Sequence, residues 1–150
     1  MPGLFYEDFE VGAVLQHDVR RTVTESDNVL FSTMTLNPQP LHLDEEFSRG
    51  TMHGQRLVNS IFTLGLVVGL TVAETTLGTT LGNLGFEEVV FPKPVFHGDT
   101  IRAETEILEK RESRSRTDSG IVWFAHSGYN QRDELVCRCR RAGLVVKRPA

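Results

Sequence analysis

The sequence is poor in cysteine, in positive charge and in long apolar runs. Only two of its 150 residues are cysteines, Cys137 and Cys139. They are two positions apart, and neighbouring side chains on one face of a strand are poorly placed for a disulfide. No further cysteine exists to complete a zinc site with them. We therefore expect two reduced thiols, as is usual in the cytoplasm.

The formal net charge of −4 argues against a nucleic-acid-binding protein, because the phosphate backbone favours a basic face. The first twelve residues show no basic start followed by an apolar run, so no secretory signal is expected. The most apolar segment, 57–73, includes four polar residues and falls short of the roughly 20 apolar residues of a membrane span. These features predict a cytoplasmic protein with neither a nucleic-acid nor a membrane partner.

The N-terminal half reads as one strand followed by helices. A strand is expected at 15–23, and Thr24 with Asp27 has the spacing of a capping box that begins a short helix. The two prolines within 37–40 require a loop. Asp44 is placed to cap a second short helix, and the central helix covers 57–74.

The C-terminal half reads as strands. We expect a turn at 82–85, a polar connection at 109–120, and strands at 86–91, 100–108, 121–126 and 134–147. A helix that is apolar on nearly all sides must be covered. A curved antiparallel sheet wrapped around it, and completed by a second copy of the chain, is the natural solution. The expected class is α+β, as one domain over 1–150.

One loop carries a motif typical of a known family. Before the central helix the chain reads Asn37-Pro38-Gln39-Pro40-Leu41-His42-Leu43-Asp44. This stretch resembles the loop of MaoC-like hydratases, and the segments FYEDFEVG, LVNSIFTLGLVVGL and FPKPVFHGDTIRAETEI are also similar to that family. The resemblance covers nearly the whole chain and implies a hotdog fold. The pieces LNPQPLHLD, RESRSR and GYNQRDELVC look most like the subgroup that hydrates mesaconyl-CoA and dehydrates methylmalyl-CoA.

The chemistry implied is reversible addition of water to the double bond of an enoyl-CoA, and His42 is the main candidate for proton transfer. Its unperturbed pKa lies near neutral pH, and the proline-braced loop can fix its orientation. In the family, an early backbone N–H of the central helix binds the enolate oxygen. Here that position is Ser60, preceded by Asn59, and a helix start offers such unpaired N–H groups.

Asn37 stands where the family has its catalytic aspartate. An amide cannot exchange a proton at neutral pH, so we expect Asn37 to orient the reacting water while His42 transfers the proton. Gln39 replaces the asparagine of the family motif. Asp44 is either a helix cap or a further carboxylate near the substrate. Arg56 is a candidate for binding a CoA phosphate or a substrate carboxylate, which suits its planar geometry.

The sequence therefore predicts a homodimeric hydro-lyase that uses no metal and no cofactor beyond the coenzyme A of its substrate. A short branched or dicarboxylic acyl-CoA is expected, with mesaconyl-CoA and methylmalyl-CoA first. Two alternatives stay open. The loss of the aspartate would suit a non-catalytic acyl-CoA-binding or partner subunit. Hotdog proteins also include thioesterases, although those usually carry an acid on or near the central helix, where 57–73 has none.

Overall fold

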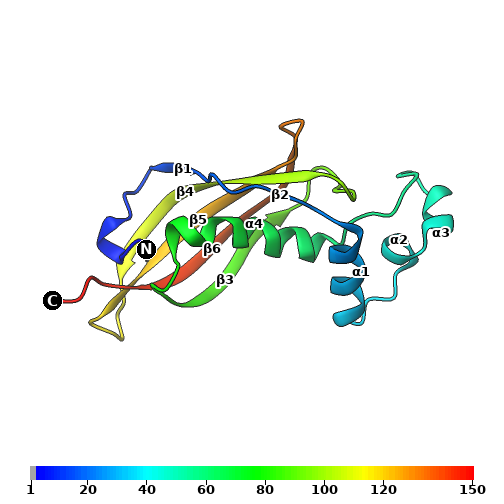
Figure 1. The fold of residues 1–150 in the computed structure, drawn as a ribbon. Coiled ribbons are helices and arrows are strands. Elements are labelled where there is room, and N and C mark those ends of the chain that lie inside the picture. The colour runs from blue at the N-terminus through cyan, green and yellow to red at the C-terminus, as the bar shows by residue number, and fades with distance from the viewer. Residues whose placement is uncertain (1–2) are drawn as a thin grey trace.

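The long apolar segment forms α4 (Ser60–Thr75), which lies across one face of an antiparallel sheet (Figure 1). This computed structural model describes residues 3–150. Within them the sheet has six strands in the order β1-β4-β5-β6-β3, with β2 beside β4. The strands are β1 (Val14–Gln16), β2 (Arg21–Thr22), β3 (Thr80–Val90), β4 (Thr100–Glu112), β5 (Ser119–Tyr129) and β6 (Leu135–Val146). This is the α+β hotdog arrangement predicted from the sequence.

Three short helices cluster beyond one end of the sheet, next to the start of α4, whereas both termini lie at the other end (Figure 1). They are α1 (Glu25–Met34), α2 (Pro40–Leu43) and α3 (Glu45–Arg49); a single 3-10 turn, η1 (Tyr6–Asp8), lies near the N-terminus. The predicted capping box is confirmed, since the Thr24 hydroxyl accepts from the Asp27 N–H and the Asp27 carboxylate accepts from the Thr24 N–H.

The core lies between α4 and the sheet. Alternate residues of β4 are buried, as its sequence pattern predicted, and they pack with α4 and with residues of β6. The closest approach is at Val67 of α4, which is fully buried opposite Gly128 of β5. A side chain at position 128 would overlap Val67, so this glycine sets the distance between the helix and the sheet.

Several boundaries differ from the prediction. β4 runs to Glu112 and β5 begins at Ser119, so only 113–118 of the connection expected at 109–120 lies outside the strands. The single strand expected at 15–23 is divided into the short β1 and β2. Residues 57–59 precede the helix, because Leu57 and Phe96 form an isolated bridge instead. The turn expected at 82–85 is wrong: these residues lie inside β3, where a register shift between Asn83 and Gly85 marks a β-bulge. Glycines are tolerated in a strand at such irregularities, so they did not mark a turn here.

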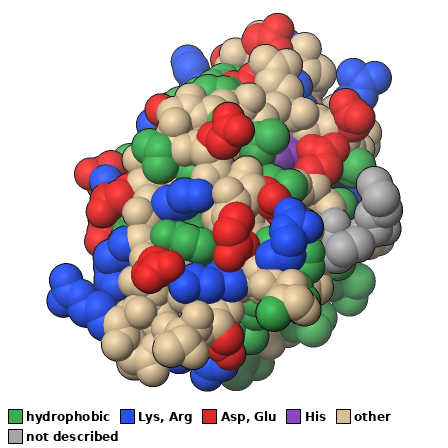
Figure 2. Space-filling view, turned by 90° about the vertical axis from the view of Figure 1, so that its left-hand side faces the viewer, with side chains coloured by type: hydrophobic (Ala, Val, Ile, Leu, Met, Phe, Trp, Pro, Cys, Tyr) green, Lys and Arg blue, Asp and Glu red, His purple; other side chains and the backbone are tan. Residues whose placement is uncertain are grey.

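The end of the molecule that holds the termini carries interspersed acidic and basic side chains (Figure 2). Ion pairs there join Arg148 to Asp8 at 2.6 Å and Lys147 to Glu112 at 2.8 Å. Exposed pairs of this kind contribute little to stability. No helix within residues 3–150 is both long and apolar enough to cross a membrane.

We expect Gly128→Ala to lower the free energy of unfolding by about 1–3 kcal/mol, because the new methyl group overlaps a buried core side chain. A Cβ atom at position 128 would lie closer to Cγ2 of Val67 than van der Waals contact allows. Urea unfolding measures the change. Gly50→Ala is the matched control, since its Cβ would meet only the Phe47 carbonyl at 3.5 Å. Equal stability of the two variants would contradict the close packing of α4 on the sheet.

Candidate active site

His42 lies in α2 and is 9% exposed. Its Nδ1 is 2.7 Å from the carbonyl oxygen of Leu57. A carbonyl only accepts, so Nδ1 carries the proton and donates it. In the neutral ring, Nε2 then holds the free lone pair. The loop motif therefore presents a histidine whose tautomer is fixed by the chain segment that leads into α4.

Asn28 of α1 holds this segment together. It is fully buried, and its Nδ2 lies within 3.2 Å of three acceptors: the carbonyls of His42 and Leu57, and Nε2 of His97. Its Oδ1 accepts from the N–H of Asn59 at 2.9 Å. One side chain thus connects α1, α2, the start of α4 and the turn before β4.

The first turn of α4 offers an unpaired backbone donor. The Asn59 N–H is bound by Asn28, and the Ile61 N–H donates to Oδ1 of Asn59 at 3.0 Å. Between them, the N–H of Ser60 has no acceptor among residues 3–150. Donors at a helix start point along the helix dipole and favour negative charge. This N–H is available to an oxyanion.

Ser60 borders a cavity of about 230 Å³. Its walls are mostly apolar and come from the segment before α4, from α4 itself and from the chain after β3: His53, Leu57, Val58, Thr63, Phe91, Pro92, Pro94 and Val95. Leu57, whose carbonyl holds His42, belongs to this wall. An apolar cavity beside a histidine and a free N–H suits an acyl group whose carbonyl is polarised at one end.

Asn37 does not border the cavity at Ser60. It borders a separate cavity of about 300 Å³ with Thr33, Leu36, Pro38 and Leu43. Its Oδ1 accepts from the Gln39 N–H at 3.1 Å, which leaves its Nδ2 as a free donor. The Gln39 side chain is exposed. Leu57 therefore relates His42 to Ser60, because it binds the histidine and borders the same cavity as Ser60. Asn37 borders a different cavity.

The remaining predicted residues are engaged within the protein. Arg56 pairs with Glu25 at 2.9 Å and with Glu45 at 2.7 Å. Asp44 accepts from the Phe47 N–H at 2.9 Å, which is the helix-capping alternative. Asn59 is buried, and its amide caps α4 and contacts Ser32. The hydrogen bonds and ion pairs of Arg56, Asp44 and Asn59 are therefore made to other groups of the protein.

Sequence reasoning missed the two residues that complete the site from outside the motif, Asn28 and His53. His97 also lies at the site, where its Nε2 is 3.0 Å from Nδ2 of Asn28. Burial and the nearby charge of Arg56 lower the pKa of His97, which keeps it neutral as an acceptor. The only sequence signal for Asn28 is a polar residue on the inner side of a short helix.

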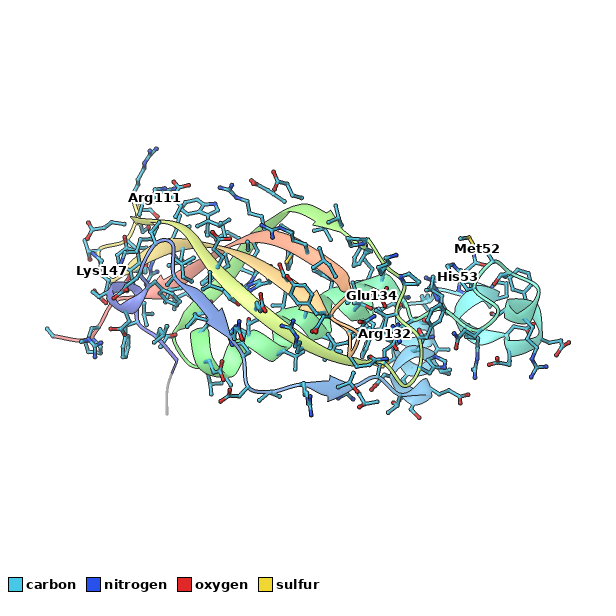
Figure 3. All side chains as sticks on the ribbon, turned by 90° about the horizontal axis from the view of Figure 1, so that it is seen from above. Met52, His53, Arg111, Arg132, Glu134 and Lys147 are labelled. Atoms are coloured by element: carbon cyan, nitrogen blue, oxygen red, sulfur yellow. The ribbon has the colours of Figure 1, made fainter. Side chains whose placement is uncertain are left out.

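A run of basic residues, Lys110, Arg111, Arg114 and Arg116, lies at the end of β4 and in the connection to β5. Figure 3 shows Arg111 and Lys147 at the end of the molecule opposite to His53 and Met52. Arg116 is paired with Asp118, and the Lys110 ammonium reaches the Tyr6 and Glu7 carbonyls. The basic run is therefore a surface connection remote from the apolar cavity at Ser60.

The chain belongs to the MaoC-like domain family, whose sequence profile matches residues 8–127. It is 35% identical to the mesaconyl-CoA hydratase of Cereibacter sphaeroides over 97% of this chain and 42% of that protein. It is 32% identical to the 3-hydroxybutyryl-CoA dehydratase of Methylorubrum extorquens over 75% of this chain and 69% of that protein. The crystal structure of the MaoC-like dehydratase from Rhodospirillum rubrum superposes with a TM-score of 0.84 at 33% identity, covering 99% and 100% of the two chains.

The mesaconyl-CoA hydratase that the chain matches is more than twice as long, so the chain spans about two fifths of it. The similarity extends over the loop with His42 and over α4, because it covers nearly all of the present chain. The family of the chain, and with it the fold that carries the site, is therefore established.

We expect Asn28→Ala to lower the free energy of unfolding by about 2 kcal/mol or more, because it leaves several buried carbonyl and N–H groups without a partner. Urea unfolding measures the loss. Gln55→Ala is the matched control: it removes an exposed amide from the loop before α4 and should leave stability within about 0.5 kcal/mol. If Asn28→Ala were as stable as this control, Asn28 would not hold the site together.

Proposed function

We propose that this chain reversibly hydrates the double bond of an enoyl-CoA. The observation that carries the proposal is the fixed tautomer of His42, which is held by the carbonyl of Leu57, together with the free N–H of Ser60; Leu57 and Ser60 border the same apolar cavity. The relatives named above are a hydratase and a dehydratase of CoA thioesters, which supports the same chemistry. No cofactor is proposed apart from the coenzyme A of the substrate.

The histidine transfers the proton. Nε2 of His42 takes a proton from water while the water oxygen bonds to Cβ of the substrate. The electrons of the double bond move to the thioester. The resulting enolate oxygen accepts a hydrogen bond from the N–H of Ser60. The imidazolium then returns its proton to Cα, so that the ring ends neutral. The Leu57 carbonyl stabilises the imidazolium through its bond from Nδ1.

Asn37 has the role of a donor in this scheme. Its Oδ1 already accepts one hydrogen bond, from the Gln39 N–H, whereas its Nδ2 has no partner and can donate to water or to the thioester. Asn37 and Ser60 border different cavities. In this scheme the substrate reaches from one cavity to the other past His42. An extended CoA thioester, with the acyl group in one hollow and the pantetheine in the other, meets this requirement.

For the acyl group we propose a short branched or dicarboxylic chain, with mesaconyl-CoA first. The cavity of about 230 Å³ limits the length of the chain. Its wall includes one ionisable side chain, His53, which is suited to a second carboxylate. A cytoplasmic location belongs to the proposal as well; it is supported by the two buried free thiols, Cys137 and Cys139.

We expect His42→Ala to reduce hydration of the best substrate by a factor of about 100 or more, because it removes the proton-transfer group. Wild type, His42→Ala and Asn37→Ala would be tested on crotonyl-CoA and mesaconyl-CoA, with products identified by mass spectrometry. Met52→Ala is the control, because Met52 is 94% exposed near the loop. Near-normal turnover by His42→Ala would exclude the proposed mechanism.

The same assay separates the alternatives. Binding of CoA esters without any product from folded wild type would identify a non-catalytic subunit, which the amide at Asn37 would explain. Release of free thiol would identify a thioesterase. Against this last function, the one acid of α4, Glu74, is bound by His17 at the far end of the helix from Ser60.

We also propose that two copies of the chain associate along β3. Within residues 3–150 this strand pairs only with β6, so its other edge is open. Large apolar side chains are exposed on β3 and on Phe91, which follows it: Leu81, Leu84, Phe86, Val90 and Phe91. The adjacent face of α4 exposes Ile61, Gly65, Gly69 and Ala73. An open edge with such residues needs a cover, and a second β3 supplies one.

We expect Leu81→Lys to convert a dimer to a monomer, because a charge on the open edge opposes strand pairing. Light scattering after size-exclusion chromatography measures the mass. Val19→Lys, which changes a similarly exposed residue away from β3, should keep the dimer. A monomeric wild type, or a Leu81→Lys variant that stays dimeric, would exclude this interface.

A further inference from the structure

The helix α1 ends in a turn that normally contains glycine. The N–H of Asn37 donates to the Ser32 carbonyl at 2.8 Å, and the N–H of Leu36 donates to the Thr33 carbonyl at 3.1 Å. These two bonds form a Schellman motif, in which the residue after the C-cap adopts the left-handed conformation. Here that residue is Leu36, whose φ is 58°. The chain therefore leaves α1 through a leucine in the left-handed region and enters the histidine loop at Asn37.

A leucine is unfavourable in this conformation. When φ is positive, Cβ crowds the following carbonyl oxygen, whereas glycine has no Cβ and asparagine is tolerated. Within residues 3–150, two other residues besides glycines have positive φ: Glu88, at an irregularity of β3, and Asp133, in the connection between β5 and β6. Leu36 is the apolar residue of the three. Strain of this kind persists where the surrounding structure imposes it, and it is concentrated at functional sites.

Packing does not offset the strain at Leu36. The residue is 87% exposed, so its side chain adds little to the core. An apolar residue often supports a Schellman motif from the next position, but here that position is Asn37. A glycine at position 36 would keep both backbone hydrogen bonds without the strain. The leucine side chain is therefore not explained by the stability of the chain.

The exposed side chain lies at the candidate active site. Leu36 borders the cavity of about 300 Å³ that Asn37 also borders. Within the described residues, 3–150, Nδ2 of Asn37 has no acceptor, so the cavity combines a hydrogen-bond donor with the apolar side chains of Leu36, Pro38 and Leu43. The pantetheine arm of coenzyme A has the complementary chemistry, because its amide carbonyls accept hydrogen bonds and its two geminal methyl groups are apolar.

We propose that Leu36 is a binding residue for the pantetheine arm of a CoA thioester. This inference rests on the proposed function, in which the arm occupies the cavity at Asn37. The turn keeps the leucine side chain at the surface, where it covers the apolar part of the arm while Nδ2 of Asn37 donates to a carbonyl of the arm. The geometry that lowers stability thus places an apolar contact beside the histidine loop.

The test compares thermal stability with affinity, because the proposal predicts opposite changes in the two. Leu36→Gly and Leu36→Asn both suit the left-handed conformation, and both remove the apolar side chain. We expect each variant to raise Tm by about 2–4 °C. We expect each to weaken the binding of butyryl-CoA by about fivefold or more. Butyryl-CoA has no double bond to hydrate, so calorimetric titration of the whole chain measures its Kd independently of turnover.

Met34→Ala is the matched control, since Met34 is 80% exposed on α1 but does not border the cavity. Its Kd should equal that of wild type. Free coenzyme A has the same arm and no acyl group, so the two Leu36 variants should lose affinity for it by a similar factor. A loss confined to butyryl-CoA would place Leu36 against the acyl group and overturn the proposal.

A higher Tm with an unchanged Kd in both Leu36 variants would also overturn it. So would weaker binding by Leu36→Gly alone, which would indicate an effect of loop flexibility, or loss of a wild-type dimer in both variants, which would place Leu36 between two copies of the chain. The proposed hydratase activity fails separately. A wild type that binds butyryl-CoA but hydrates no enoyl-CoA excludes that activity, while the Kd values still decide the role of Leu36. A wild type that binds no CoA ester would exclude both.

Discussion

The packing of α4 against the sheet is the contact on which the other features of the molecule depend. Val67 can be fully buried because position 128 of β5 has no side chain, so the helix lies close to the strands. The Asn59 cap and the bridge between Leu57 and Phe96 fix where α4 begins. The first turn of the helix then carries the free N–H of Ser60, and the segment before it carries the carbonyl that orients His42.

The candidate active site combines parts of the chain that are distant in sequence. Asn28 binds the backbone of the histidine loop, the start of α4 and the turn that contains His97. Because so many polar groups depend on one amide, the geometry at His42 is determined by tertiary hydrogen bonds and not by its helix, which is a single turn. The apolar cavity adds a binding space beside this fixed framework.

One unsatisfied feature lies outside the site, at the edge of β3. The open edge of this strand exposes apolar side chains. An open sheet edge is unfavourable in isolation. The proposed dimer removes this cost.

The sequence by itself determined the capping box at Thr24, the alternation of β4, the apolar central helix and the loop with His42, because these patterns are local in the chain. It could not place the bulge in β3, where glycines had indicated a turn. Only the tertiary structure decided that Arg56 is paired with two acids and that Asn28 binds the histidine loop. The physical reason is that hydrogen-bond partners and burial depend on contacts between distant segments, which no local pattern records.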